Sequence, residues 1–411
     1  MTEAVVNPDA NPEANLGELQ VTDDMTNLLD FSSPHSKFRA LTEAGGFLEP
    51  MEGVAMHFDR ETIEYVLHHP ELFSSQVEMG LGNTRPLIPL NVDPPQHSNY
   101  RRLLDPLFSP KKMAEHEPDI ARRANAMIDT FIDKGTCNFT DDFADLLPTS
   151  VFLGLTGLPE DRLEEFLHLR DGILHPEKQD EMAAFDGEVR MRVMNATGLK
   201  IYALFTELIE DRRKHPSGDV ISQFIEAEVD GVRLTDNDML DILFLFLIAG
   251  LDTVSDTLTC FYAFLAQNPD HRKQIVDDPS CIDNAVEEML RWEAPVPFSS
   301  PRTATADVTL PNGCKVTTGS MVLNAYGSAN VCPIEFTDPH EVRFDRTRNR
   351  HITFGLGPHR CLGSHLARRE LRVTLREWHR RIPEYWLTPG HEELSYPPGL
   401  RHVRDLMLTW K

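Results

Sequence analysis

Basic residues are scarce in this sequence, and its cysteines are few and widely separated. Lys and Arg together number 40 against 65 Asp and Glu, so the 411-residue chain carries a formal net charge of −25. Such a surface repels phosphate backbones, which argues against a nucleic-acid partner. The six cysteines lie at least 18 residues apart. Because the sequence has no Cys-x-x-Cys pair, a cysteine-rich zinc site is not expected.

Long apolar runs are also missing. The longest, Ile242–Leu251, has ten residues between Asp241 and Asp252, about half of the roughly 20 that a transmembrane helix needs. The acidic N-terminus has neither the basic segment nor the apolar core of a secretory signal. We therefore predict a cytoplasmic protein with reduced cysteines and no membrane anchor. A mobile acidic tail is expected over residues 1–20, followed by a single catalytic domain over residues 21–411.

Helical patterns dominate the middle of the chain, whereas strand-like pieces are short and lie towards its two ends. The predicted helices include residues 117–132, 160–174, 199–213, 284–292 and 364–381. The predicted strands are residues 54–58, 308–310, 315–317 and 321–324, punctuated by turn residues. Because helices and strands do not alternate, we expect a mainly α fold with a minor β part (α+β).

The segment Thr235–Gln267 is predicted to form one long central helix, because favourable N-cap residues precede it and Asn268-Pro269 supplies a stop. At 1.5 Å per residue it would span roughly 50 Å. Gly250, Asp252 and Thr253 interrupt its apolar centre. Taken alone, these residues have two interpretations of similar weight: a packing notch with a satisfied polar pair, or a functional site.

The segment from Phe354 to Gly363 contains the most specific pattern, a glycine-rich loop that leads to one cysteine just before a predicted helix. Glycines allow tight turns and the close approach of a flat ligand. A cysteine at a helix N-terminus has its thiolate stabilised by free N–H groups, as a thiolate ligand of haem iron requires. A buried free cysteine is the alternative, but it leaves the ten-residue pattern unexplained. The segment resembles the haem-binding loop of the cytochrome P450 superfamily at Phe354, Gly355, Gly357, Cys361 and Gly363.

Three further motifs fit the same family in the same order, and the resemblance covers roughly residues 30–411. Ala249-Gly250-Leu251-Asp252-Thr253 looks like the family's oxygen-activation motif on its long central helix. Glu288 and Arg291 form an E-x-x-R motif, and His97 and Arg101 resemble the family's helix that reaches the haem propionates. The resemblance implies the cytochrome P450 fold, with a long central helix over a haem and small β-sheets at the side.

The resemblance also implies roles for these residues. The cofactor would be haem b, and Cys361 would be the ligand of its iron. Phe354, Gly355 and Gly363 would shape the loop beside the metal. Buried propionates need cations, which by resemblance are His97, Arg101, Arg302 and His359. Glu288 and Arg291 would form a structural ion pair with a further arginine, for which Arg343, Arg346 and Arg348 are candidates and Arg346 is favoured.

On the central helix, the expected catalytic residues are Ala249, Gly250, Asp252 and Thr253. Gly250 would open the helix wall over the iron. The Thr253 hydroxyl can bond the carbonyl of Ala249 or turn to bound dioxygen, and Asp252 can relay protons from solvent. This sequence has both the acid and the alcohol, as the members of the family that use O₂ do.

No flavin or iron–sulfur motif is visible, so electrons are expected from a separate ferredoxin fed by an NAD(P)H-dependent reductase. An acidic ferredoxin would dock on a basic face near the cysteine, despite the negative net charge. The arginines that cluster in sequence there are Arg360, Arg368, Arg369, Arg372 and Arg376, with Arg101, Arg102, Lys111 and Lys112 as possible additions.

The substrate is expected to be a small hydrophobic molecule, because the segments that would line the pocket by resemblance are mostly apolar. Terpenoids, steroids, lipids and small aromatics all remain open. Arg85 could pair with a substrate carboxylate, although a surface position is favoured for it. The expected pocket residues are Leu87, Ile88, Leu245, Ile248, Val296, Phe298 and Leu400.

Four functions compete. The first is a haem-thiolate monooxygenase that hydroxylates a hydrophobic molecule. A haem-thiolate binding or sensing protein without turnover is the second, and Asp252-Thr253 argues against it because a sensor needs no proton relay. The third is a family member that performs C–C coupling, epoxidation or demethylation, which the sequence does not separate from hydroxylation. A hydrolase with a cysteine nucleophile is the fourth, but it leaves the glycine-rich loop unexplained.

Overall fold

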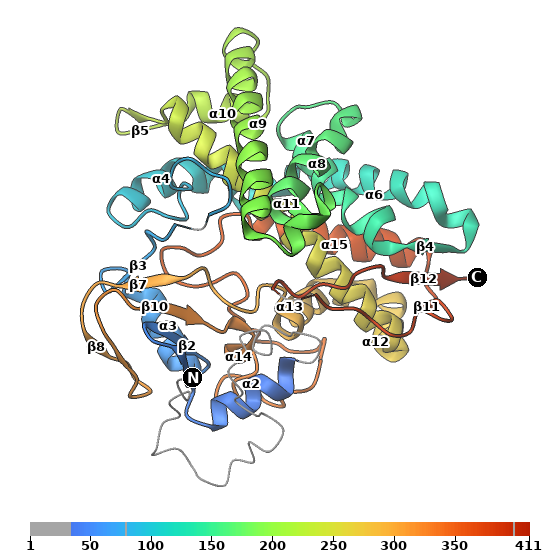
Figure 1. Ribbon diagram of the computed structural model, residues 1–411. Helices are drawn as coiled ribbons and strands as arrows, with labels where there is room; N and C mark the ends of the chain where they lie inside the picture. Colours follow the sequence, from blue (N-terminus) through green and yellow to red (C-terminus); the bar gives the residue numbers. More distant parts are fainter. Residues whose placement is uncertain (1–33, 79, 398) are drawn as a thin grey trace.

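The computed structural model describes residues 34–78, 80–397 and 399–411 (Figure 1). The tail predicted for residues 1–20, and the first part of the domain predicted over residues 21–411, lie outside these ranges. Helices form most of the described chain and its sheets are small, which confirms the prediction of a mainly α fold with a minor β part.

The helices fall into long and short groups. The long helices are α6 (Glu117–Phe131), α8 (Leu163–Leu174), α9 (Gly187–Lys214), α11 (Asp236–Gln267), α13 (Ile282–Glu293) and α15 (Ser364–Arg381). The shorter ones are α2 (Pro34–Glu43), α3 (Arg60–His68), α4 (Gln96–Leu104), α5 (Pro110–Glu115), α7 (Leu146–Leu155), α10 (Val220–Glu226), α12 (Pro269–Asp277) and α14 (Tyr326–Ala329). Short 3₁₀ or π turns connect them: η2 (Asp105–Phe108), η3 (Ile132–Lys134), η4 (Thr140–Ala144), η5 (Glu160–Arg162), η6 (Pro176–Lys178), η7 (Glu181–Ala184) and η8 (Pro279–Cys281).

The central helix α11 forms as predicted, because both of its ends carry strong signals. The Thr235 side chain accepts a hydrogen bond from the backbone N–H of Asp238, whose carboxylate accepts from the N–H of Thr235. This capping box fixes the first turn, and Asn268-Pro269 follows the last one. Within the described ranges, α11 is the one helix long and apolar enough to cross a membrane, yet 78% of its most apolar window is buried. It is therefore the core helix of the molecule.

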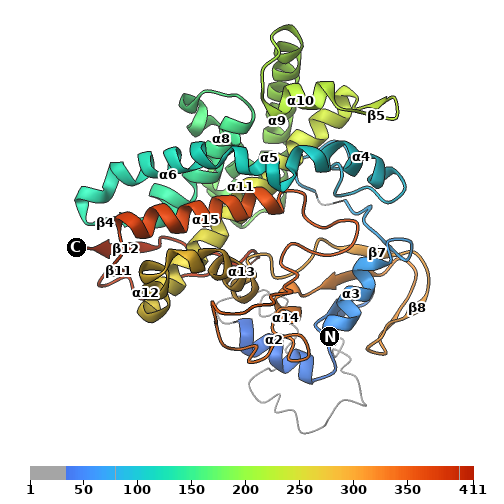
Figure 2. The same ribbon diagram turned by 180° about the vertical axis from the view of Figure 1, so that it is seen from behind.

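Two hydrophobic cores meet along α11. The N-terminal half of α11 packs with α8, α9 and α10 around residues such as Phe166, Phe205 and Leu247. The C-terminal half packs with α6, α13 and α15 around an aromatic group in which Phe139 stacks on Tyr262 at 4.2 Å between ring centroids. Figure 2 shows α15 lying beside α6 across this second core. Along α11, the last residue of the first core is Leu251 and the first residue of the second core is Val254. The polar centre of α11 therefore lies at the junction of the two cores.

Small sheets lie at the edges of the molecule, the largest on the left of Figure 1 and a second on the right, beside the C-terminus. The largest has the order β1-β2-β10-β7-β3, in which β10 runs parallel to β2 with Val322 opposite Ala55 and all other pairs are antiparallel. A second sheet has the order β11-β12-β4, and two hairpins complete the set. The strands are β1 (Phe47–Met51), β2 (Val54–His57), β3 (Phe73–Ser74), β4 (Thr136–Asn138), β5 (Glu228–Val229), β6 (Val232–Arg233), β7 (Arg302–Ala304), β8 (Val308–Thr309), β9 (Lys315–Val316), β10 (Met321–Asn324), β11 (Tyr385–Leu387) and β12 (Met407–Trp410).

Candidate active site

The glycine-rich loop before α15 turns tightly because two of its glycines adopt a left-handed conformation. Gly355 and Gly357 both have φ near +68°, a region that residues with a side chain rarely enter. A Cβ on Gly357 would lie 2.2 Å from the carbonyl oxygen of Leu67, so the backbone of the loop approaches α3 too closely for any side chain. The backbone N–H of Cys361 then donates to the carbonyl of Phe354 at 2.8 Å, which closes the loop.

Cys361 is placed at the start of α15 with its side chain open to an internal cavity. The N–H of Gly363 donates to the sulfur. Burial among protein atoms raises the pKa of the Cys361 thiol, while this hydrogen bond and the charges of Arg101 and Arg360 act in the opposite direction. A metal ion at the sulfur would reverse the balance, because a coordinating thiol is deprotonated.

The cavity has a volume of about 360 Å³ and lies between Cys361 and the centre of α11. Its lining is mostly apolar and comes chiefly from α7, the central part of α11, α15 and the segment after α13. These apolar residues include Val151, Phe152, Leu155, Leu245, Phe246, Pro295, Val296 and Leu366.

Three of the four predicted catalytic residues of α11 line this cavity. Ala249, Gly250 and Thr253 face it, and the Thr253 hydroxyl donates to the carbonyl oxygen of Ala249 at 2.8 Å. A Cβ on Gly250 would meet no atom within 4 Å, so this glycine leaves the helix wall open. The Thr253 hydroxyl lies at the cavity surface and can exchange its partner on the helix for one inside the cavity.

Asp252 turns the other way, into a polar cluster between α11 and α8. It is buried, and one of its carboxylate oxygens lies 2.7 Å from Nε2 of His175. Its other oxygen lies 3.5 Å from Nε of Arg170. Burial opposes ionisation of Asp252, but His175 and Arg170 outweigh it and lower the pKa of the carboxyl group. Arg170 also pairs with Asp145 and Asp171.

A group of basic side chains lies on the opposite rim of the cavity. His97, Arg101, Arg302 and His359 all line it, and the rings of His97 and His359 lie 4.1 Å apart. Burial and neighbouring positive charge lower the pKa of His97 to about 4 and that of His359 to about 3. Within the described ranges, neither ring nitrogen of His97 has a hydrogen-bond partner and Arg302 forms no ion pair. Crowded donors of this kind fit an anionic ligand.

Comparison with known proteins identifies the family. The family model described as "Cytochrome P450" matches residues 47–278 and 280–378.

The chain belongs to the cytochrome P450 family.

Bacterial P450s supply its relatives. A probable cytochrome P450 127A1 from Sinorhizobium fredii is 35% identical over 84% of this chain and 80% of its own. A steroid C26-monooxygenase from Mycobacterium tuberculosis is 32% identical over 80% of this chain and 87% of its own. The crystal structure of CYP109E1 from Bacillus megaterium with testosterone is 26% identical, with a TM-score of 0.82 over 92% of this chain and 99% of that one. These likenesses confirm the predicted fold.

As a P450, the chain is an oxidoreductase of the monooxygenase class whose cofactor is haem b. The residues present fit that group. The sulfur of Cys361 opens onto the cavity, and His97, whose ring nitrogens have no hydrogen-bond partner in the described residues, lies on its rim together with Arg101, Arg302 and His359, where two propionates need donors.

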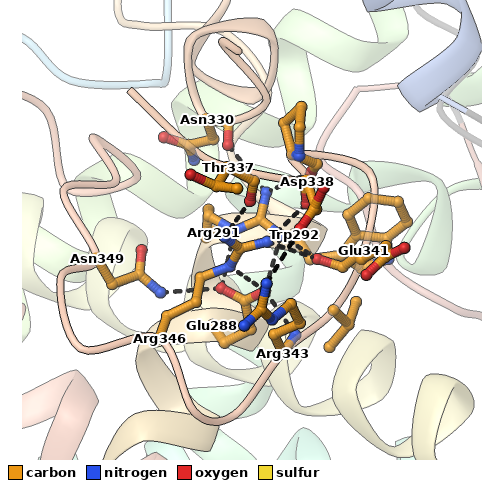
Figure 3. Close-up of polar contacts among 12 residues, drawn as sticks. Glu288, Arg291, Trp292, Asn330, Thr337, Asp338, Glu341, Arg343, Arg346 and Asn349 are labelled. Carbon is orange, nitrogen blue, oxygen red and sulfur yellow. Dashed lines mark hydrogen bonds and ion pairs between the residues drawn. The ribbon is translucent and has the colours of Figure 1, made fainter. Parts of the chain in front are cut away.

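The E-x-x-R motif of this P450 lies in a closed ionic network beneath the cavity (Figure 3). Glu288 and Arg291 are 0% exposed and joined by two hydrogen bonds of 2.8 Å. Of the three candidate arginines, Arg346 supplies the second partner, with Nε 2.9 Å from Glu288. Glu288 also accepts from the backbone N–H of Arg343 and the side chain of Asn349. The remaining guanidinium donors of the two arginines bond the carbonyls of Asn330, Thr337, Asp338, Pro339 and Glu341.

The structure separates the predicted substrate residues into two groups. Leu245 and Val296 line the cavity. Leu87, Ile88 and Ile248 are instead packed inside the first core, because they face the neighbouring helices. Phe298 lies against Phe38 and Phe58 in edge-to-face contacts, and Leu400 is not among the lining residues. These five positions correct the expected lining. The loop before α4, the central helix and the segment after α13 do reach the cavity, whereas no described residue near Leu400 lines it.

Arg85 is not among the residues that line the cavity, and 35% of its side chain is exposed. Its guanidinium lies 2.9 Å from the buried carboxylate of Asp241 on α11 and 4.9 Å from the ring centre of Tyr202 on α9. The Tyr202 hydroxyl donates to the same carboxylate. Nearby, a Cβ on Gly198 would lie 2.1 Å from the carbonyl oxygen of Gly82. Arg85 therefore fastens the loop before α4 to α9 and α11.

The arginines of α15 are largely neutralised by acids from neighbouring helices. Arg368 pairs with Glu287 at 2.7 Å, and Glu117 pairs with both Arg369 and Arg376. Arg360 has no ion pair within the described ranges. A surface depression of about 300 Å³ remains positively charged, lined by Pro110, Arg360, His365, Arg368, Arg369 and Arg372.

Several residues of the site carry no signal that sequence reasoning could use. His175 ends α8 as an isolated histidine, and nothing in its spacing connects it with Asp252. Tyr326 lines the cavity from α14. Glu370 on α15 also lines it, and burial raises the pKa of this carboxyl group to about 8.

Proposed function

We propose that this P450 inserts one oxygen atom of O₂ into a small hydrophobic substrate such as a steroid, terpenoid, lipid or aromatic compound. The balanced reaction is RH + O₂ + 2 H⁺ + 2 e⁻ → ROH + H₂O. The electrons come from a ferredoxin and its NAD(P)H-dependent reductase in the cytoplasm. The observation that carries this proposal is the arrangement at the centre of α11, where an open wall and a hydroxyl face the cavity of Cys361 and an acid lies directly behind.

Each group at the site has a role in this proposal. When bound, the haem supplies the iron at which dioxygen is reduced. Cys361 would hold that iron, while His97, Arg101, Arg302 and His359 would hold the propionates. Phe354, Gly355 and Gly363 shape the loop around the sulfur. Thr253 would donate its hydroxyl proton into the cavity at Oγ1, and Asp252 would supply the protons that the reaction consumes. Leu245 and Val296 exclude water beside the substrate.

The first test is the difference spectrum of the dithionite-reduced protein with and without carbon monoxide. We expect the strongly red-shifted Soret band of a haem thiolate. Cys361→Ser should abolish that band, whereas Cys332→Ser, which alters a half-buried cysteine outside the cavity, should retain it. An unshifted band in the unaltered protein, or a red-shifted band in Cys361→Ser, would refute the assignment of the ligand.

Turnover separates a monooxygenase from a sensor. Testosterone is the probe because a structural relative was solved with it, and it is added with NADPH, ferredoxin and reductase while products are analysed by mass. Gain of one oxygen atom supports hydroxylation, loss of a methylene unit indicates demethylation, and loss of two hydrogens indicates coupling.

Thr253→Ala should divert electrons into hydrogen peroxide, because the threonine hydroxyl no longer helps to deliver protons. Unchanged coupling would show that protons reach the oxygen without Thr253.

The docking site of the ferredoxin is proposed from the positive charge near Cys361. The arginine-lined depression lies beside Cys361, so an acidic ferredoxin placed there would be near the cofactor. Reduction by ferredoxin should slow as salt is added, since steering charges are screened. Arg360→Glu should slow it further at low salt, whereas Arg39→Glu on the distant α2 should not. Equal rates for both variants would exclude this docking face.

A further inference from the structure

His175 connects the buried acid of α11 with the surface. It is the C-cap residue of α8, and its Nε2 atom lies 2.7 Å from Asp252. The His175 side chain is 22% exposed, whereas that of Asp252 is only 8% exposed. On its other side, Nδ1 of His175 lies 3.7 Å from Glu177, which is 30% exposed. The imidazole therefore has one nitrogen on the buried acid and the other towards solvent.

Charged groups face His175 from every element packed around it. Asp252 approaches from α11, Arg170 and Asp171 from α8, and Glu177 and Lys178 from η6. His402 approaches from the C-terminal segment, with its ring centre 6.4 Å away. The groups one step further out are Asp145, which pairs with Arg170, and Asp256, which lies 3.6 Å from His402.

The electrostatics of the pair favour a stored proton. Burial disfavours the charged imidazolium, but the hydrogen bond and the charge of Asp252 outweigh it and raise the pKa of His175 above 6.5. The pKa of Asp252 is lowered in turn. Burial, with the charges of Asp252 and Asp145, raises the pKa of Asp256 well above its usual range. These opposite shifts place the proton of the pair on His175 rather than on Asp252.

We propose that His175 takes up protons from solvent and passes them to Asp252 while the enzyme reduces oxygen. This role rests on the proposed function, because it supplies the protons that function consumes. It adds a titrating group that lies outside the cavity and is absent from the motif of α11.

The transfer is a simple proton relay with a defined donor and acceptor. A neutral ring that carries its proton on Nε2 takes a proton from water at Nδ1, and the resulting imidazolium gives its Nε2 proton to Oδ2 of Asp252. The ring then holds its proton on Nδ1, and before the next cycle it loses this proton to water and regains one at Nε2. The transfer to Oδ2 neutralises both His175 and Asp252. It therefore removes the charge attraction that holds the carboxyl group of Asp252 against His175 and Arg170. The protonated acid lies one residue before Thr253, whose hydroxyl faces the cavity. Two such transfers supply the two protons of the balanced reaction.

The decisive variant is His175→Gln. Glutamine keeps a nitrogen donor for Asp252 but holds no titratable proton, so a purely structural tie between α8 and α11 would survive the change. His402→Gln is the matched control, since it removes another imidazole from the same surroundings without touching the hydrogen bond to Asp252. Oxygen uptake is measured for each holoprotein with NADPH, ferredoxin and reductase, in the presence of testosterone. This signal needs protons whether or not testosterone is oxidised.

We expect His175→Gln to slow oxygen uptake on the order of tenfold. This is less than the roughly hundredfold or more that a general acid contributes, because water can partly replace the ring. The unaltered protein should lose activity as the pH rises through the pKa of His175, and the variant should lack this decline. A solvent deuterium effect should increase in the variant. Peroxide-driven turnover needs no net protons and should be unchanged, as should the carbon monoxide spectrum.

A second readout does not depend on turnover. The NMR signal of His175 is assigned by its absence from the spectrum of His175→Gln. The pKa read from this signal should lie above 6.5 in the unaltered protein and shift towards 6.5 in Asp252→Asn. Uptake by His175→Gln equal to that of the unaltered protein over the same pH range, or a His175 that titrates at or below 6.5, would overturn the inference. Failure of the proposed function would look different, because the thiolate band or any oxygen uptake would then be missing from the unaltered protein itself.

Discussion

Two buried ionic clusters of this P450 are built from similar residues but differ in their access to water. In the Glu288 network (Glu288, Arg291 and Arg346), Glu288 and Arg291 are 0% exposed, and backbone carbonyls satisfy the remaining arginine donors. The Asp252 cluster (Asp252, Arg170 and His175) reaches the surface through one titratable ring. In the first cluster, arginine donors hold their charge at any pH at which the protein is folded. In the second, the histidine can gain or lose its charge near neutral pH.

The difference explains how the same kind of interaction can hold a fold together in one place and move protons in another. A closed network fixes the segment between α14 and the glycine-rich loop, which is where the ring of carbonyls lies. An open cluster can exchange protons because its members are not all locked by backbone partners. Four changes would test this contrast, and they are described from the largest effect to the smallest.

Glu288→Ala should have the largest effect. It leaves Arg291 and Arg346 buried without their shared carboxylate, and breaking a buried pair in this way costs about 3–5 kcal/mol. We expect little folded haem protein, with a much lower urea midpoint for helical circular dichroism. Glu43→Ala removes one partner of an exposed pair and should change the midpoint little. Similar midpoints for the two variants would show that the network is not essential for stability.

Asp252→Asn should preserve the fold but slow the reaction. The amide keeps the shape of the side chain, and Arg170 retains Asp145 and Asp171. Because the proton carrier is lost, oxygen uptake should fall about a hundredfold. The urea midpoint should fall less than in Glu288→Ala. Uptake within twofold of the unaltered protein would place the proton supply elsewhere, and exposed Asp211→Asn serves as the control.

Arg346→Lys tests the geometry of the closed network. Lysine keeps the charge but loses the fork that reaches the carbonyls of Thr337, Asp338 and Glu341. These hydrogen bonds lie near the surface, so each one lost is worth about 0.5–1.5 kcal/mol. Thermal unfolding should show this loss, whereas Arg348→Lys, two residues along the same segment, should unfold like the unaltered protein. Indistinguishable unfolding curves would mean that charge alone maintains the network.

The pH dependence of stability should show the smallest effect, and only in the open cluster. The folded pKa of His175 is raised above 6.5, so its contribution is fully present below about pH 6.5 and is lost as the pH rises through the folded value. The difference in unfolding free energy between the unaltered protein and His175→Gln should therefore shrink above pH 6.5. A difference that stays constant or grows across this range would contradict the raised pKa.

The sequence predicted most of the fold, because its strongest patterns are local. The helix 364–381 and the strand 321–324 have the predicted bounds, and α11 begins just after its predicted cap. The loop around Cys361 was visible for the same reason, since its glycines, its cysteine and the start of the next helix are contiguous. The resemblance to P450s added the residues that lie far apart in the sequence.

The directions of side chains could not be read in the same way. Asp252 and Thr253 are neighbours in sequence, yet one faces His175 and the other the cavity. Phe298 was expected beside the substrate but packs against Phe38 and Phe58, because contacts with α2 decide its rotamer and no spacing rule encodes them. The partners of the arginines on α15 were missed because Glu117 and Glu287 come from helices remote in sequence.

The order of strands β11-β12-β4 also bears on how the chain is made. Thr136 in β4 bonds the carbonyl of Leu408 in β12, a residue 272 positions later. At 5–20 residues per second, a ribosome needs roughly 15 to 55 seconds to add that stretch. Until then β4 has an open edge, and the aromatic group around Trp378 is incomplete. A nascent chain of this P450 should therefore bind chaperones through residues 136–144 for much of its synthesis.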